Sequence, residues 1–124
     1  MLDWEMVGIG SGPQDLGQYI LSNMSINERR ECELRVIKAY YDELIKSCSR
    51  SGNLAASSSF ITFEECFREY KIGGIERWLW FLVYFCGQDD GSPLLKWAQF
   101  FHDQIRAFIH DHNLKPNDFI QPRP

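Results

Sequence analysis

The sequence lacks an apolar run long enough to cross a lipid bilayer. Its most hydrophobic stretch, WLWFLVYFC, covers only residues 78–86, whereas a transmembrane helix needs roughly 20 consecutive apolar residues. We therefore interpret this stretch as buried core and expect no membrane span. A secretory leader is not visible at the start of the chain either. Together these absences favour a cytoplasmic protein.

Positive charge is not concentrated anywhere in the chain. The formal net charge is −4, and lysine and arginine are scattered. The densest charged cluster, residues 28–31 (ERRE), mixes both signs, and we interpret it as a solvated helix face. Because nucleic-acid-binding domains usually carry a basic stripe, we expect no nucleic-acid partner.

The cysteines lack the spacing of a zinc site. No Cys-x-x-Cys pair occurs among the four of them, which are Cys32, Cys48, Cys66 and Cys86. In a chain without a visible leader, we expect reduced thiols packed mostly on helix faces.

Strand-forming sequence is also scarce. Only residues 1–7 have the pattern of a strand, and the loop GIGSGP follows. A single strand leaves backbone groups unpaired on both edges. Either residues 1–7 are not a strand, or their sheet lies outside this chain. We expect a mainly α fold: a helical subdomain with one short N-terminal strand from a missing sheet, forming a single partial domain over residues 1–124.

Helical periodicity covers most of the chain before residue 50. A short buried helix is expected after Asp15, with Leu16, Tyr19 and Ile20 on one face. The capping box of Ser25 and Glu28 predicts the start of the longest helix, over about 26–48. Its apolar stripe consists of Leu34, Ile37, Tyr41, Leu44 and Cys48. Residues 50–59, which are small and polar, predict a flexible loop.

Helical periodicity also covers most of the second half of the chain. A capping box of Thr62 and Glu65 predicts another helix, which we expect Gly73-Gly74 to interrupt before a central apolar segment at 75–86. A last helix begins near Pro93 and is stopped by Asn113 and Pro116. Its apolar face consists of Leu94, Ala98, Phe101, Ile105, Phe108 and His112. Residues 117–124 predict an extended tail.

Two carboxylates stand out at the start of the chain. Asp3 and Glu5 flank Trp4, and in a strand they point to the same face. Adjacent carboxylates repel each other unless a cation lies between them. They are either solvated acids at a frayed terminus or ligands of a cation.

The segment LDWEMVGIGSGPQDLGQYI resembles the aminoglycoside phosphotransferase and choline kinase-like enzymes. In that family a strand ends in Ile-Asp-Trp/Phe-Glu after the catalytic loop, and an Asp-Leu pair opens a buried helix. Here the matching residues are Leu2-Asp3-Trp4-Glu5 and Asp15-Leu16. The later stretches KAYYDEL and ITFEECFREY are similar in pattern to the C-terminal lobe of the ecdysteroid kinase-like branch.

The resemblance implies a role for each matched acid. Asp3 matches the aspartate that holds Mg²⁺ against the ATP phosphates, since phosphoryl transfer depends on positioning and charge neutralisation. Glu5 matches an acid two positions on, and we treat it as a further metal candidate. Asp15 matches a buried aspartate that supports the catalytic loop, although a plain N-cap explains it too.

The resemblance also has a gap. These kinases carry a His-x-Asp-x-x-x-x-Asn loop before the metal strand and an ATP-binding N-terminal lobe, whereas only two residues precede Asp3. We therefore expect the C-terminal part of a small-molecule kinase, inactive by itself. The alternative is a freestanding helical binding module derived from that fold. Neither the substrate nor the oligomeric state can be read from the sequence.

Other patterns are better explained by structure than by chemistry. The stretch 110–117 (HDHNLKPN) follows the metal strand and has His112 where a catalytic base should stand. Helical spacing keeps His102 about 12 Å from the later histidines, too far to share one ion. The turn Asp89-Asp90-Gly91 lacks the alternating acids of a calcium loop. An aromatic cage of Trp78, Trp80 and Trp97 is less expected than core packing.

Overall fold

The computed structural model of the chain describes residues 11–50, 61–87 and 94–120. These residues form helices and contain no strand. The helices are α1 (Gly12–Asn23), α2 (Ile26–Arg50), α3 (Phe63–Cys86), α4 (Leu94–Asp111) and α5 (Pro116–Ile120). The expected mainly α class is confirmed for this part of the chain. The strand expected at residues 1–7 lies outside the described residues, as does the loop expected at 50–59 apart from Arg50, which ends α2.

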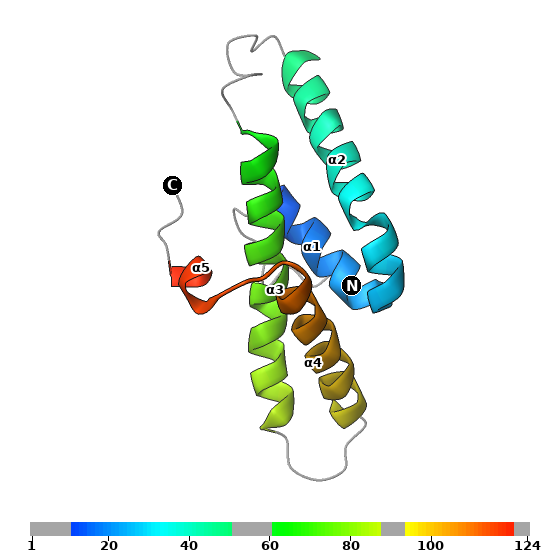
Figure 1. Ribbon diagram of the computed structural model, residues 1–124, viewed down its shortest axis with the longest axis vertical. Coiled ribbons are helices and arrows are strands. Elements are labelled where there is room, and N and C mark those ends of the chain that lie inside the picture. Colours follow the sequence, from blue (N-terminus) through cyan, green and yellow to red (C-terminus); the bar gives the residue numbers. More distant parts are fainter. Residues whose placement is uncertain (1–10, 51–60, 88–93, 121–124) are drawn as a thin grey trace, which may run out of the picture.

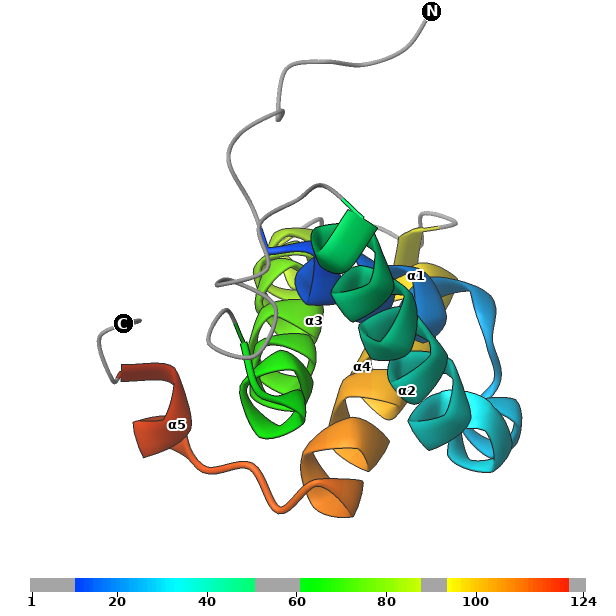
Figure 2. The same ribbon diagram turned by 90° about the horizontal axis from the view of Figure 1, so that it is seen from above.

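The long helix α3 is the centre of the arrangement. Figure 1 shows α2 beside its N-terminal half and α4 beside its C-terminal half, and Figure 2 shows the same grouping from above. α1 packs across the middle of α3. The buried cluster draws on α1 to α4 and consists of Ile20, Leu21, Ile37, Tyr70, Ile75 and Phe108.

Both predicted capping boxes are confirmed. The backbone N–H of Ser25 donates to Glu28 at 2.8 Å, and the N–H of Glu28 donates to the Ser25 hydroxyl at 3.3 Å. Thr62 and Glu65 make the same reciprocal bonds at 2.7 and 3.2 Å. Each box supplies partners to N–H groups that a helix start leaves unpaired, so α2 and α3 begin where the sequence predicts.

The end of α4 also follows the prediction. Asn113 adopts a positive φ of 50°, the left-handed conformation that commonly ends a helix. Its N–H donates to the carbonyl of His110 at 3.2 Å, and the next N–H, of Leu114, donates to Ile109 at 3.0 Å. The predicted face of α4 is buried at Ala98, Phe101, Ile105 and Phe108.

The glycine pair does not interrupt α3, which corrects the expectation of two segments. Gly73 and Gly74 are buried inside one continuous helix because α1 crosses there. A Cβ at Gly74 would lie 3.0 Å from Cα of Gly17, and a Cβ at Gly17 would lie 2.7 Å from Cα of Gly74. The glycines therefore let two backbones touch, and this contact offsets their poor helix propensity.

The apolar stretch 78–86 is only partly core. Trp78 and Leu79 pack against the buried cluster, but Trp80 and Tyr84 are exposed and Val83 is 75% exposed. The last turns of α3 therefore keep apolar side chains in solvent on one face. Two residues assigned to apolar stripes, Tyr19 and Leu34, are likewise exposed.

The C-terminal tail differs from the expectation in its first residues. Pro116–Ile120 form the short helix α5, where an extended chain was predicted from residue 117. The carboxylate of Asp118 accepts a hydrogen bond from the N–H of Lys115 at 2.7 Å and so supports the first turn. Residues 121–124 lie outside the described residues. Among the described helices, none is both long and apolar enough to span a membrane.

The glycine crossing can be tested by Gly74→Ala. Helix propensity alone would stabilise this variant by about 1 kcal/mol. The backbone contact with Gly17 predicts the opposite sign, a destabilisation of about 1–3 kcal/mol, because the added methyl group overfills the crossing. Urea unfolding followed by circular dichroism measures the difference. The control is Gly87→Ala, whose new Cβ would meet its nearest atom at 3.5 Å; equal effects of the two substitutions would refute the crossing.

Candidate functional site

Only one of the matched acids lies among the described residues. Asp3 and Glu5 fall outside them, so their proposed roles stay predictions. Asp15 lies in the first turn of α1 and is exposed, and Ser11 rather than Asp15 occupies the N-cap position. The plain N-cap explanation of Asp15 is therefore wrong, and its support of a catalytic loop stays a prediction.

The start of α1 is held against α2 by Tyr40. A Cβ at Gly12 would lie 2.1 Å from the Tyr40 hydroxyl, so Gly12 leaves room for this ring. Burial raises the pKa of Tyr40, and the nearby Cys66 and Asp15 raise it further. Tyr40 of α2 is thus a neutral side chain that contacts the first residue of α1. This end of α1 is the one nearer in sequence to Asp3 and Glu5.

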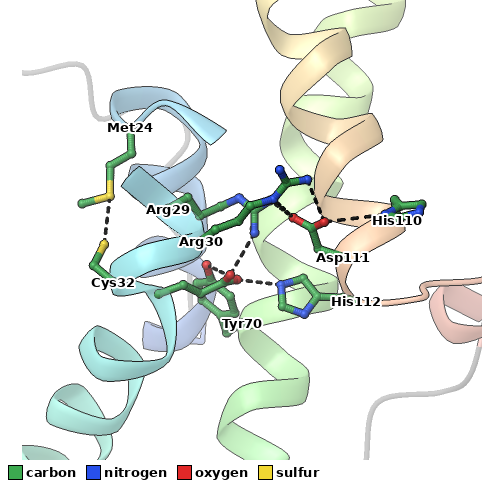
Figure 3. Close-up of polar contacts among 9 residues, drawn as sticks. Met24, Arg29, Arg30, Cys32, Tyr70, His110, Asp111 and His112 are labelled. Carbon is green, nitrogen blue, oxygen red and sulfur yellow. Dashed lines mark hydrogen bonds and ion pairs between the residues drawn. The ribbon is translucent and has the colours of Figure 1, made fainter. Parts of the chain in front are cut away.

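A second cluster, which we call the Glu33 network, joins α2, α3 and the end of α4 (Figure 3). The Glu33 carboxylate accepts hydrogen bonds from Arg29 Nη1 at 2.8 Å and from the Tyr70 hydroxyl at 3.0 Å. His112 Nε2 lies 2.6 Å from the same carboxylate. Each contact comes from a different segment, so Glu33 ties three parts of the fold together.

Asp111 extends this network at the C-terminal end of α4. Arg30 binds it with two nitrogens, Nε at 2.8 Å and Nη2 at 2.9 Å, and Arg29 donates to it through Nη2. Paired N–H···O bonds of this kind are among the stronger hydrogen bonds in proteins. Arg29 therefore bridges two carboxylates, Glu33 within its own helix and Asp111 on α4.

The electrostatics keep both carboxylates ionised. Burial alone would raise the pKa of Glu33, but the hydrogen bond from His112 and the charge of Arg29 outweigh it, and the pKa is lowered. The hydrogen bond from Arg30 holds the pKa of Asp111 well below its usual range, with a further contribution from Arg29. Burial raises the pKa of Tyr70, and the neighbouring Glu33 carboxylate adds to this.

The chemistry of this network is structural. Glu33 is ionised and engaged by donors, so it is poorly suited to accept a substrate proton. His112 is held by Glu33 and lies against the rings of Phe67 and Phe108, at centroid distances of 5.6 and 4.5 Å. The stretch 110–117 thus contains the end of α4, which binds α2 through Asp111 and His112. Within the described ranges, no group of three acidic, histidine or cysteine side chains could hold a metal ion.

The sequence did not predict this network, because charged side chains in a helix were expected to be exposed to solvent. Arg29 is 0% exposed, although the cluster at 28–31 was expected to be a solvated face. The available signal was the spacing of Arg29, Glu33 and Ile37, which places two opposite charges on the same face as a buried isoleucine.

The tryptophans stack rather than form a cage. Trp78 and Trp97 both stack on Phe101, at centroid distances of 4.4 and 6.2 Å. Trp80 stacks on Tyr84 at 6.4 Å. Phe101 is buried, so Trp78 and Trp97 pack around a core ring.

Comparison with known protein families identifies a relationship for the first part of the chain. The family model DUF1679, described as "Uncharacterized oxidoreductase dhs-27", matches residues 1–72, which include α1, α2 and the first turns of α3. This family falls in the kinase-like and ecdysteroid kinase group. No curated protein and no solved structure matches the chain.

The Glu33 network can be tested by Glu33→Gln. Removing this charge leaves Arg29 buried with only part of its pairing, and loss of one partner of a buried pair costs about 3–5 kcal/mol. Denaturant unfolding measures the loss. The matched control is Glu43→Gln, on the same helix, whose exposed ion pairs with Lys46 and Arg50 should contribute less than about 1 kcal/mol. A loss no larger than that of the control would contradict the network.

The lowered pKa values of Glu33 and Asp111 predict acid sensitivity. Their stabilisation is fully present above the unfolded-state values of 4.5 and 3.8, and it is lost as the pH falls through the lower pKa values of the folded state. We expect Asp111→Asn to flatten the decline of the unfolding free energy between about pH 5 and 3. Asp42→Asn, which removes an exposed carboxylate paired with Lys38, serves as the control. Identical pH profiles for both variants would rule out the assignment to Asp111.

Proposed function

Because the chain belongs to the DUF1679 family, within the kinase-like and ecdysteroid kinase group, we propose that it is the C-terminal part of an ATP-dependent kinase. The complete protein would transfer the γ-phosphoryl group of ATP to a hydroxyl of a small metabolite. The observation that carries this proposal is the family match itself. It covers both the Asp3-Trp4-Glu5 segment and the Asp15-Leu16 pair.

The acids at the start of the chain fit a magnesium site. Mg²⁺ prefers carboxylate oxygens and is commonly bound by one or two carboxylates together with substrate phosphates. Asp3 would hold the ion, and Glu5 would be a second ligand or would orient the first. When bound, Mg²⁺ neutralises the charge that develops on the phosphates.

The helices would form the wall of the substrate lobe. α1 directly follows the proposed metal segment and is held by the glycine crossing and by Tyr40. A fixed α1 supports accurate placement of the segment before it, which phosphoryl transfer requires. The proposed kinase also requires a His-x-Asp-x-x-x-x-Asn loop and an ATP-binding lobe, which in such enzymes precede the metal strand.

The description of the family names an oxidoreductase, and the sequence offers less support for that chemistry. A dinucleotide-binding turn has glycines in the pattern Gly-x-Gly-x-x-Gly between a strand and a helix. Here Gly8, Gly10 and Gly12 are spaced Gly-x-Gly-x-Gly, and Pro13 follows.

A second candidate function is a freestanding helical binding module. The observation that favours it is the set of exposed apolar side chains at one end of α3 and α4, which are Trp80, Val83, Tyr84, Leu95 and Trp97. Exposed apolar clusters commonly mark interaction surfaces. A missing lobe or a separate partner would both cover such a surface, so the sequence of the encoding transcript decides between the two functions.

The first experiment is to sequence the transcript upstream of the codon for Met1. An in-frame His-x-Asp-x-x-x-x-Asn stretch about fifteen to twenty residues before Asp3 supports the kinase. A stop codon close upstream of Met1 would refute it for this protein and leave the binding module.

If the upstream sequence encodes the loop, the longest encoded chain should hydrolyse or transfer phosphate from ATP only with Mg²⁺. Asp3→Asn should lower kcat by about a hundredfold or more, since the metal contributes several kcal/mol to phosphoryl transfer. Asp118→Asn, an exposed carboxylate on α5, is the control. An Asp3→Asn enzyme with unchanged kcat and unchanged Mg²⁺ dependence would overturn the metal assignment.

A further inference from the structure

A groove opens between the C-terminal end of α1 and the first turns of α4. Residues 22–25 form one side, and Lys96, Trp97 and Phe100 form the other. Its volume of about 640 Å³ lies in the range of small-molecule sites. The groove lies at the C-terminal end of α1, a helix about 18 Å long.

The walls of the groove are apolar and include a flat face. Trp97 is 54% exposed and stacks on Phe101, which holds its ring in place. Phe100 meets Trp97 edge to face at 6.2 Å. Met24 lies opposite them, and its thioether sulfur accepts a hydrogen bond from Cys32 Sγ at 3.6 Å while the side chain packs against the buried cluster. A planar apolar group can lie against such a surface with favourable ring contacts.

Among the described residues that line the groove, Lys96 is the one cation. Ser22 Oγ and Asn23 Nδ2 donate to the carbonyls of α1, at 2.9 Å to Gln18 and 2.9 Å to Tyr19. Ser25 is occupied by its capping box with Glu28. Lys96 is exposed, and no carboxylate of the described residues pairs with it. It lies in the first turn of α4, where the helix dipole is positive and favours an anion.

We propose that this groove binds a small amphipathic anion. The planar apolar part of the ligand lies on Trp97, between Phe100 and Met24, and its carboxylate pairs with Lys96. Charge complementarity decides the ligand class, since Lys96 is the charged side chain of the groove and its remaining lining is apolar or already hydrogen-bonded. This ligand is independent of the proposed kinase activity, and failure of either proposal leaves the other standing.

The test uses 2-naphthoate as the anion and 2-naphthylmethanol as its neutral analogue. Both are titrated into the ¹⁵N-labelled chain while the indole N–H signals are followed, with each signal assigned by a Trp→Phe variant. We expect a saturable shift of the Trp97 signal and a Kd for 2-naphthoate about fivefold lower than that for the alcohol, as one partly exposed ion pair provides.

Two substitutions separate charge from stacking. Lys96→Gln should remove the preference for the anion, whereas Lys38→Gln, an exposed lysine on α2 with the same charge change, should keep it. Trp97→Ala should weaken binding of both compounds about tenfold, with the helix content checked by circular dichroism.

Several results would overturn the proposal. These are equal affinity for the two compounds, no saturable shift at millimolar concentrations, or a shift of the Trp80 signal in place of Trp97. A dimer in light scattering that Trp97→Ala dissociates would assign the groove to a second copy of the chain. Binding to anionic vesicles without binding of free 2-naphthoate would assign it to a membrane surface.

Discussion

The fold depends on a buried arginine that must be paired. Arg29 is fully enclosed, and an unpaired guanidinium in the protein interior would cost several kcal/mol. Glu33 on the same helix and Asp111 at the end of α4 neutralise it, and Tyr70 of α3 and His112 complete the shell around Glu33. In this arrangement α2, α3 and the end of α4 satisfy these groups together. The network therefore adds specificity of packing beyond what apolar contacts supply.

A second constraint, of shape rather than charge, fixes α1. Gly17 and Gly74 bring the backbones of α1 and α3 into contact, and the large side chains on either side of this contact fill the space around it. Charge pairing alone would leave α1 free to slide, because no ion pair among the described residues reaches it. The glycine contact and the Glu33 network therefore act on different helices, and together they define the positions of α1 to α4.

The sequence predicted those features that depend on neighbouring residues. Both capping boxes and the stop at Asn113 are local hydrogen-bond patterns, and they occur as expected. Features that depend on distant residues were missed. From the sequence alone, Gly73-Gly74 predicts a helix break, and only the crossing of α1 explains why the helix continues. Arg29 likewise predicts a solvated side chain, and only the position of Asp111 explains why it is buried. The magnesium role assigned to Asp3 came from the family resemblance, and Asp15 is exposed where the resemblance implied burial.

The same constraints bear on the groove at the start of α4. This helix is about 27 Å long, and Asp111 anchors its C-terminal end to α2. Midway along it, Phe101 stacks on Trp78 of α3 at 4.4 Å. Gln104, between these two contacts, donates to the carbonyl of Met24 at 2.6 Å and so ties α4 to the segment on the other side of the groove. Since a preformed site loses less conformational entropy on binding, the rigidity that the buried arginine imposes at one end of α4 favours recognition at the other.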